Sequence, residues 1–204
     1  MPRLPRSFFR RDAVTVAREL LGMTLVHRVA GRRVAGRIVE TEAYLGVEDA
    51  AAHTFRGRRT PRNETMYHDG GCLYVYFTYG MHHCANVVAS REGDPVAVLL
   101  RALEPLEGLD FMRQQRPKAR RDVDLCSGPA KLCAALGVTR EHNGVDLVAS
   151  PDLFITPPGS TPGSKSTSGG DIVARPRIGI DYAGGWRDKP LRFYLRGNPH
   201  VSKP

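Results

Sequence analysis

The chain has 204 residues, a length that fits one domain with a substantial hydrophobic core and no need for disulfide staples. Thirty Lys and Arg residues against 21 Asp and Glu give a net charge of +9, which favours a polyanionic partner, and nucleic acid over a membrane surface. The four cysteines form no Cys-x-x-Cys pair, and no apolar run approaches the ~18 residues of a membrane span. We therefore expect an intracellular protein with reduced thiols, cytoplasmic or nucleoid-associated, or nuclear in a eukaryote.

The first predicted elements are a basic arm at residues 1 to 11 and a helix. Asp12 can cap this helix, which runs to Leu21, and Gly22 ends it. Two β-like runs follow at residues 23 to 29 and 34 to 42, joined by a short turn, and they predict a hairpin.

The second strand of this hairpin carries the most informative side chains of the chain. Glu40, Glu42 and Tyr44 alternate with their neighbours, so they project from one face of an extended strand at about 7 Å per two-residue step. We expect the two carboxylates at an edge or an end of the sheet, in an active site. A solvated strand face is the alternative interpretation.

A loop and a second hairpin come next. Residues 54 to 63 are rich in arginine and lack acidic residues, a composition suited to phosphate binding, although a solvated charge run is the alternative. The runs 73 to 77 and 84 to 88 predict two strands whose turn presents Tyr79 beside Gly80. His82 and His83 adjoin Cys84, but no second ligand pair stands at zinc-finger spacing, so no metal is predicted.

The second half of the chain predicts more strands and two helices. An apolar run from Pro95 to Leu103 is typical of a central strand, in which the lone Arg101 needs an anionic partner. A helix is predicted over 106 to 115. A basic cluster at 113 to 121 follows, and then a second helix with Ser127 as its cap, Pro129 at its start and Gly137 at its end.

The C-terminal quarter predicts a loop and a return to the sheet. Residues 156 to 171 are rich in Gly, Pro, Ser and Thr, which predicts a mobile loop and not a domain boundary. The β-like runs 172 to 180 and 191 to 195 then rejoin the sheet, with Trp186 between them as a core residue.

Planar side chains gather near the two carboxylates. Tyr44, His53, Tyr76, Tyr79 and, on weaker grounds, Tyr74 fall in strands and turns around them. Core packing accounts for any one of these rings. A protein that flips a base out of duplex DNA needs a wedge, cations for the distorted backbone and rings that stack on the base, and the combination here matches all three needs.

Six stretches of this sequence resemble the alkyladenine (3-methyladenine, or methylpurine) DNA glycosylase family. They are Arg-Ile-Val-Glu-Thr-Glu-Ala-Tyr-Leu-Gly with Ala-Ala-His, Thr-Pro-Arg-Asn, Leu-Tyr-Val-Tyr-Phe-Thr-Tyr-Gly-Met, Leu-Leu-Arg-Ala-Leu-Glu-Pro, Leu-Cys-Ser-Gly-Pro-Ala-Lys-Leu-Cys and Lys-Pro-Leu-Arg-Phe-Tyr. The resemblance runs in order from about Asp12 to Val201 and is weaker in 108 to 124 and 151 to 172.

The resemblance implies one mixed α/β (α+β) domain over residues 1 to 204, built around a curved, mainly antiparallel sheet with a protruding hairpin that inserts into DNA. It further implies a monomeric base-excision repair enzyme that acts on double-stranded DNA without a cofactor. Such an enzyme flips out alkylated or deaminated purines, among them 3-methyladenine, 7-methylguanine and hypoxanthine. It then hydrolyses the N-glycosidic bond and leaves an abasic site.

The resemblance also assigns roles to particular residues. Glu42 activates the attacking water, assisted by Arg101 and the backbone carbonyl of Ile178. Tyr44, His53 and Tyr76 match residues that stack on the extruded base, and Asn86 matches one that crowds the 2-amino group of guanine. Tyr79 matches the wedge, and Met81 and Arg58 match positions that contact DNA. No lysine falls in the pocket motifs, which indicates a monofunctional glycosylase without a Schiff base.

Two departures and two rival functions accompany this interpretation. Asp181 and Tyr182 stand where mammalian members have Gly and His, and His82 and His83 replace larger aromatics after the wedge. One rival is a nuclease that uses Glu40 and Glu42 as magnesium ligands. The other is a non-catalytic module that binds distorted DNA.

Overall fold

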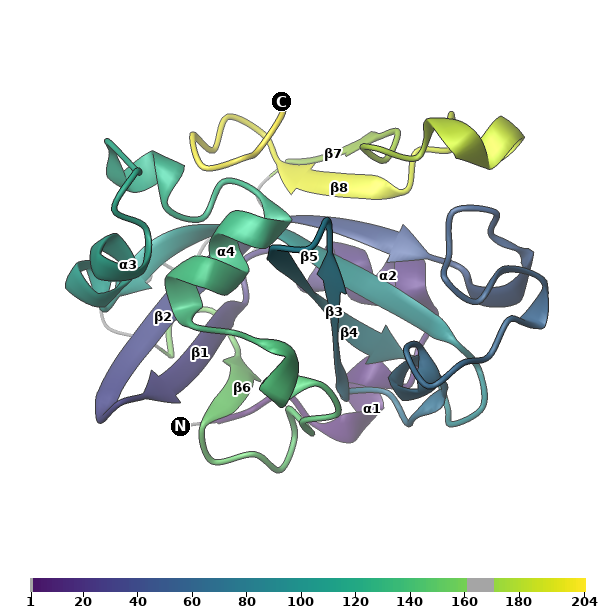
Figure 1. Cartoon of the computed structure of the whole chain (residues 1–204), viewed down its shortest axis with the longest axis horizontal. Helices are drawn as coiled ribbons and strands as arrows, with labels where there is room; N and C mark the ends of the chain where they lie inside the picture. The colour runs from purple at the N-terminus through teal and green to yellow at the C-terminus, as the bar shows by residue number, and fades with distance from the viewer. Residues whose placement is uncertain (1, 161–170) are drawn as a thin grey trace.

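The computed structural model describes residues 2–160 and 171–204 as one mixed α/β domain around a curled antiparallel sheet (Figure 1). The described residues form eight strands in the order β3-β4-β5-β2-β1-β6, with β8 added to β2 and β7 to β8. Their bounds are β1 Thr24–Val29, β2 Arg32–Tyr44, β3 Leu73–Thr78, β4 His82–Ala89, β5 Val96–Glu107, β6 Leu153–Thr156, β7 Ile172–Arg175 and β8 Arg192–Leu195.

The helices are short and cover the sheet. α2 packs on β2 and β5, and α4 packs on β4 and β5. The α-helices are α1 Arg6–Phe9, α2 Ala13–Glu19, α3 Leu109–Gln115 and α4 Pro129–Leu136. Single 3-10 turns lie at η1 Gly46–Glu48, η2 Phe55–Gly57, η3 Glu64–Tyr67, η4 Asp122–Asp124, η5 Arg140–His142 and η6 Asp181–Trp186. Within the part of the chain described, no helix is long and apolar enough to cross a membrane.

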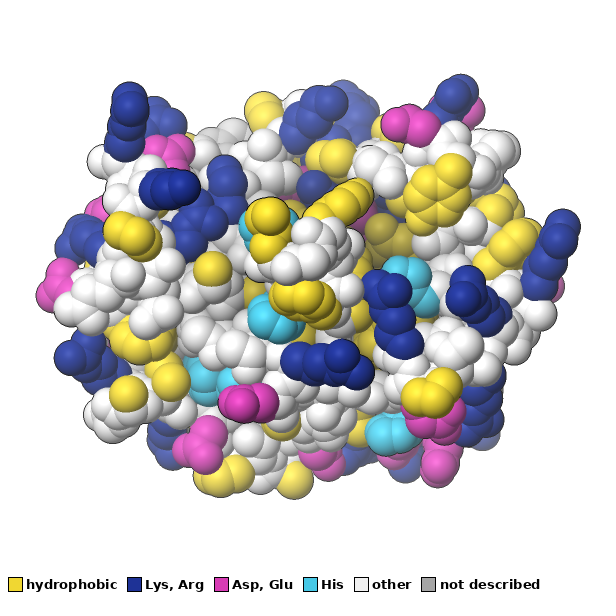
Figure 2. Space-filling model, in the orientation of Figure 1, with side chains coloured by type: hydrophobic (Ala, Val, Ile, Leu, Met, Phe, Trp, Pro, Cys, Tyr) yellow, Lys and Arg dark blue, Asp and Glu magenta, His cyan; other side chains and the backbone are white. Residues whose placement is uncertain are grey.

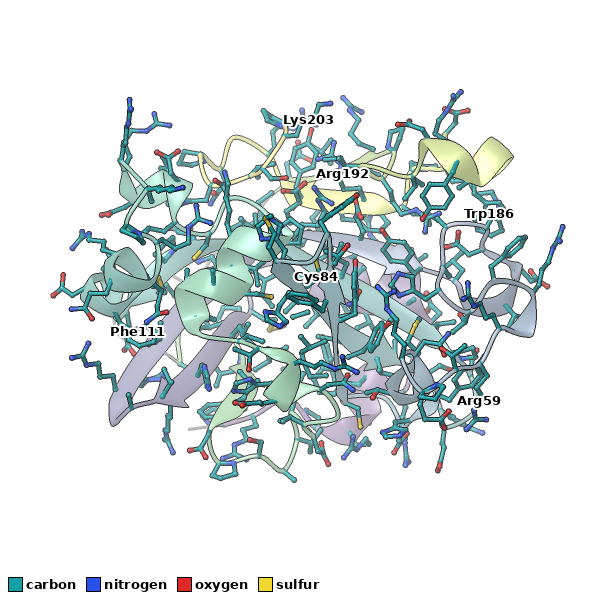
Figure 3. The ribbon with its side chains drawn as sticks, viewed as in Figure 1. Arg59, Cys84, Phe111, Trp186, Arg192 and Lys203 are labelled. Carbon is teal, nitrogen blue, oxygen red and sulfur yellow. The ribbon has the colours of Figure 1, made fainter. Side chains whose placement is uncertain are left out.

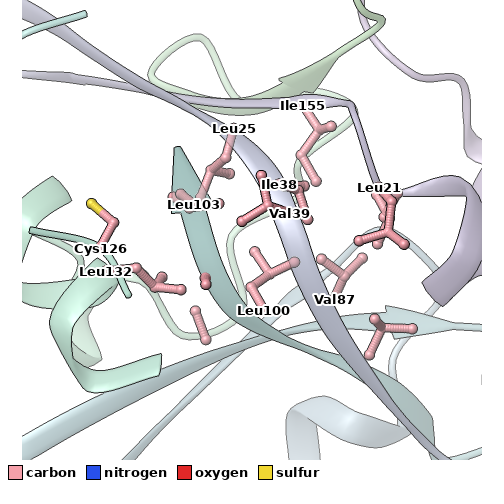
Figure 4. Close-up of a cluster of buried hydrophobic side chains, with 14 of the residues drawn as sticks. Leu21, Leu25, Ile38, Val39, Val87, Leu100, Leu103, Cys126, Leu132 and Ile155 are labelled. Carbon is pink, nitrogen blue, oxygen red and sulfur yellow. The ribbon is translucent and has the colours of Figure 1, made fainter. Parts of the chain in front are cut away.

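The two longest strands, β2 and β5, form the frame of the domain. Ile38 of β2 and Leu100 of β5 lie in the core shown in Figure 4, among side chains from other strands and helices. Both residues are fully buried, so truncating either to alanine removes apolar burial and leaves a cavity, at a cost of about 2–5 kcal/mol in the free energy of unfolding.

The carboxylates predicted at a sheet edge or end lie in the interior of the sheet, close to the end of β2. Glu40 and Glu42 pair with β5 on one side, and β8 covers the other side with Tyr194 opposite Glu40 and Arg192 opposite Glu42. The expectation of an edge was wrong because a strand from the far end of the chain closes it. Register shifts flank Glu40 in the β2–β5 ladder and increase the local twist.

The N-terminal segment, predicted as a basic arm, folds back onto the domain from residue 2 onward. Leu4 and Phe9 are buried, and the backbone N–H of Leu4 donates to the carbonyl of Ile155 at 3.1 Å. Its arginines contact the domain, Arg3 through the carbonyl of Ala149 and Arg10 through Asp69 at 2.7 Å. The basic composition predicted a free arm, but the burial of Leu4 and Phe9 packs this segment onto the domain.

Several element boundaries differ from those expected. The helix predicted from residue 106 begins at Leu109, because β5 continues to Glu107 and Gly108 turns the chain with φ 73°. α4 begins at Pro129 and ends at Gly137 as predicted, but its N-cap residue is Gly128, and Ser127 instead accepts a hydrogen bond from Lys131. Asp12 caps α2 as predicted, accepting from the N–H of Thr15 at 2.8 Å.

The C-terminal predictions hold in part. The loop predicted over 156 to 171 begins later, since Thr156 ends β6 and is fully buried, and its residues 161–170 lie outside the described residues. The strand predicted over 172 to 180 stops at Arg175, before Pro176. Trp186 packs only partly into the core, with the Lys189 ammonium 3.2 Å from its ring centroid.

Candidate active site and DNA-facing surface

Glu42 is the centre of the site and is fully buried. Its Oε1 accepts the backbone N–H of Ile178 at 2.8 Å and lies 3.2 Å from Nη1 of Arg101. Its Oε2 accepts the hydroxyl of Tyr44 at 2.9 Å. The alternative of a solvated strand face is therefore wrong for this carboxylate.

Arg101 was predicted to need an anionic partner, and it forms ion pairs with two carboxylates. Its Nε lies 3.3 Å from Oε1 of Glu40, while its Nη1 binds Glu42. Glu40 is also fully buried, and it accepts from Arg192 Nη1 at 2.9 Å and from the N–H of Ser202 at 2.7 Å. Arg192 and Lys203 lie at the same end of the molecule in Figure 3.

Burial raises the pKa of Glu42 above its ordinary value, and this effect outweighs the opposing contributions of Arg101, the Ile178 N–H and the Tyr44 hydroxyl. The pKa of Tyr44 is raised far above that of a free phenol, first by burial and then by the nearby Glu42 charge. Tyr44 is thus a neutral donor, and Glu42 is a carboxylate of increased basicity.

A cavity of about 270 Å³ opens in front of this carboxylate. Its lining includes the side chains that the resemblance assigns to base stacking, base selection and the wedge, which are Tyr44, His53, Tyr76, Asn86 and Tyr79. It also includes Ile178, whose carbonyl the resemblance assigns to the water site. Glu42 lies behind this lining and reaches the cavity through its partners Tyr44 and Ile178. Figure 2 shows hydrophobic and His side chains around a hollow on this face, with Lys and Arg side chains nearby.

The rings of the cavity hold one another in place. The ring centroids of His53 and Tyr76 are 4.6 Å apart at an interplanar angle of 79°, and His53 Nδ1 lies 2.9 Å from the Tyr74 hydroxyl. His53 is exposed at the cavity, and partial desolvation of its ring by these neighbours, with the Arg62 and Arg58 charges, lowers the pKa of His53 to about 4, so the imidazole is neutral at physiological pH. Tyr74, the weakest of the sequence candidates, is itself buried and orients His53.

Asn86 is buried at the back of the cavity. Its Nδ2 donates to the carbonyl of Tyr74 at 3.2 Å across the β3–β4 ladder, which fixes the side chain against the pocket. An amide held in this way presents a rigid wall to a planar ligand.

An ion pair that the sequence did not reveal supports Tyr44 from behind. The guanidinium of Arg177 lies 4.6 Å from the Tyr44 ring centroid and binds Asp49 at 2.8 Å, and the side chains of the ion pair are fully buried. Arg177 also donates to the carbonyl of Ala43 at 3.0 Å. Because Arg177 directly precedes Ile178, this anchor places the N–H that binds Glu42.

The β3–β4 turn presents apolar side chains to solvent. Tyr79 is 87% exposed and adopts φ 51°, and Met81 is 69% exposed. The resemblance assigns Tyr79 to the DNA wedge and Met81 to a DNA contact, and Tyr79 also lines the cavity. Arg58 is exposed and lines an adjoining cavity, whereas Arg59 in the same loop is paired with Glu64.

The geometry gives the magnesium-nuclease alternative no support. Both glutamates bind arginine guanidinium groups, and Glu40 has its two oxygens engaged by three donors. No cluster of three or more His, Cys, Asp or Glu side chains suited to a metal ion occurs among residues 2–160 and 171–204.

The fold and the site define a class of protein: an antiparallel α/β domain with a buried carboxylate behind an aromatic cavity and an exposed tyrosine hairpin at its mouth. Comparison with known families makes the assignment specific. The model of the methylpurine-DNA glycosylase family matches residues 7–199, and the chain belongs to this family. The resemblance noted in the sequence is confirmed.

Curated relatives agree with the family assignment. The chain is 51% identical to a DNA-3-methyladenine glycosylase of Mus musculus, covering 98% of this chain and 61% of the mouse protein. It is 47% identical to a DNA-3-methyladenine glycosylase of Homo sapiens, covering 99% of this chain and 68% of the human protein. It is also 49% identical to a protein of Methanocella arvoryzae provisionally described as a 3-methyladenine DNA glycosylase, over 100% of this chain and 97% of that protein.

Proposed function

We propose that this chain is a DNA-3-methyladenine glycosylase of base-excision repair that removes damaged purines from duplex DNA. The observation that carries the proposal is Glu42, held by Arg101, the Ile178 N–H and the Tyr44 hydroxyl directly behind an aromatic cavity. Family membership and the relatives named above support the same activity.

The cavity binds the flipped base by stacking. Purines alkylated at N3 or N7 are electron-poor and often cationic, so the faces of Tyr44 and Tyr76 attract them. His53 adds a ring that carries no charge at neutral pH, so it stacks without repelling a cationic base. Asn86 is rigid and buried, and it crowds the position of a guanine 2-amino group.

Hydrolysis follows from the acceptor positions of Glu42. An ionised carboxylate offers about four acceptor positions. The Ile178 N–H and the Tyr44 hydroxyl occupy two of these, and the Arg101 guanidinium, 3.2 Å from Oε1, faces a third. The remaining position accepts a proton from water as the water oxygen attacks the anomeric carbon. The glycosidic C–N bond breaks, and its electron pair leaves with the base and neutralises the charge of an alkylated purine. The Ile178 carbonyl assists in holding this water.

The hairpin supplies the wedge. Tyr79 and Met81 enter the minor groove and fill the space left by the flipped nucleotide, while Arg58 contacts the backbone. The protein acts as a monomer, because this one chain provides the wedge, the cavity and the carboxylate. The exposed side chains at the β3–β4 tip support this role.

The test is single-turnover excision from duplexes carrying one 7-methylguanine or one hypoxanthine, in the presence of chelator, followed by alkali. Release of free base with alkali-dependent strand breaks is expected, and Glu42→Gln should abolish release while retaining DNA binding. Glu107→Gln is the matched control, since this glutamate pairs with Arg33 at the far end of β5. Tight binding without release by the unmodified protein would favour the non-catalytic DNA-binding module.

A further inference from the structure

We propose that Glu40 and Arg192 are positioning residues that divide the Arg101 guanidinium between two carboxylates and thereby control catalysis by Glu42. This inference rests on the proposed role of Glu42 as the general base. Neither residue lines the cavity, so any effect that they have on excision reaches the substrate through other groups.

The guanidinium of Arg101 is shared. Its Nε faces Glu40 at 3.3 Å and its Nη1 faces Glu42 at 3.2 Å. Neither contact is short, so the guanidinium is not drawn fully onto either carboxylate. The position of Arg101 is therefore a balance between the attractions of Glu40 and Glu42.

Glu40 is held from the side away from the cavity. Arg192 Nη1 binds its Oε1 at 2.9 Å, and the N–H of Ser202 binds its Oε2 at 2.7 Å. Arg192 is fixed in turn by the carbonyls of Pro176 at 3.0 Å and Lys203 at 2.6 Å. The C-terminal segment thus holds Glu40 and Arg192 in register with the active site.

The four side chains form a dry cluster with two positive and two negative charges. Glu40 and Glu42 are fully buried, Arg192 is 5% exposed and Arg101 is 7% exposed. The other groups that face Glu42 are neutral: the Tyr44 hydroxyl, the Ile178 N–H, and, at longer range, the Tyr76, Cys84 and Tyr182 side chains. Arg101, Glu40 and Arg192 are therefore the charged groups through which this cluster acts on Glu42.

The two positioning residues should act in opposite directions. Replacing Glu40 by a neutral amide removes a like charge from the neighbourhood of Glu42 and releases Arg101 toward it, so Glu42 holds its proton less tightly. Replacing Arg192 by glutamine leaves Glu40 to draw Arg101 away, so Glu42 holds its proton more tightly. A residue that merely supports folding lowers activity without this pair of opposite signs.

The experiment measures the pH profile of single-turnover excision of 7-methylguanine, a cationic leaving group that needs no proton from the enzyme. The acid limb is the low-pH range in which the rate rises as Glu42 loses its proton. In Glu40→Gln this limb should move down by about one pH unit, and in Arg192→Gln it should move up by a similar amount. A shift of this size is expected for unit charges roughly 7 Å apart in a medium of intermediate dielectric. The control Glu107→Gln should leave the limb in place. The plateau rate of Glu40→Gln should fall by at most about tenfold, because Glu42 is then a weaker base.

The outcomes separate this inference from the proposed function. An unmodified protein that does not excise, or a Glu42→Gln variant that excises at the original rate, refutes the role of Glu42 itself. An active protein whose acid limb stays fixed in both variants, or moves in the same direction in both, overturns the inference alone. Thermal unfolding establishes that each variant is folded. If Glu40→Gln does not fold, Arg192→Gln alone tests the inference: an upward shift of its acid limb supports it, and a fixed limb overturns it.

Discussion

The hydroxyl of Tyr44 offers a direct measure of how the site tunes its carboxylate. Tyr44→Phe keeps the stacking ring and removes one donor, 2.9 Å from Oε2 of Glu42. A hydrogen bond to a charged group contributes about 1.5 kcal/mol, which corresponds to roughly one pKa unit. Because this donor lowers a pKa that burial has already raised, its loss should raise the Glu42 pKa further and move the acid limb of excision up by about one pH unit.

The assay is single-turnover release of 7-methylguanine between about pH 4.5 and 8. Tyr76→Phe is the matched control, because this ring lines the same cavity while its hydroxyl interacts with the Cys84 thiol. The control should keep the acid limb of the unmodified protein. A Tyr44→Phe variant that loses activity equally at every pH, with its limb in place, would refute the argument that this hydroxyl acts on the ionisation of Glu42.

Three further predictions concern stability, affinity and insertion. Burial raises the pKa of Glu42 in the folded protein. The free energy of unfolding therefore falls as pH rises from the ordinary glutamate pKa to this raised pKa, because the folded protein must then ionise a buried group. Glu42→Gln should therefore gain melting temperature relative to the unmodified protein as pH rises above the ordinary glutamate pKa of about 4.3, and a constant difference would contradict this. Arg58→Ala should reduce the slope of log affinity against log salt by about 1, whereas an unchanged slope would mean no phosphate contact. Tyr79→Ala should leave thermal stability within about 0.5 kcal/mol, because the ring is 87% exposed, but should slow excision from duplex DNA at least about tenfold. A matching loss of stability would indicate a structural role instead.

Local sequence patterns predicted those parts of the fold in which the spacing of apolar and polar residues, or a turn residue, specifies the local structure. The alternation of residues 34 to 42 predicts β2, and the glycine turn predicts the β3–β4 hairpin with Tyr79 at its tip. The rule that a charge in an apolar strand needs a partner predicted that Arg101 binds an acid. Each of these inferences uses a signal contained within a few residues.

Contacts between distant segments left no such signal. Arg177 and Asp49 are 128 residues apart, and Arg192 and Glu40 are 152 residues apart, yet each pair is buried and close. Their partners could not be chosen from the sequence, because every arginine carries the same charge and only the fold decides which acid it meets. The same limitation explains the expected N-terminal arm, whose basic composition concealed the apolar residues that anchor it.

The placement of Glu42 shows why these distant contacts matter for catalysis. A carboxylate in the cavity wall would be hydrated and would have a weak affinity for protons, whereas burial raises its pKa and makes it a stronger base. Burial without partners would leave the group protonated and inert at neutral pH. Donors from β2, β5 and the segment after β7 offset part of that cost, and two of them, Tyr44 and Ile178, also line the cavity. Tyr44 thus belongs both to the cavity lining and to the donors that lower the Glu42 pKa, so a substitution that removes its ring and hydroxyl should change lesion binding and pH dependence together.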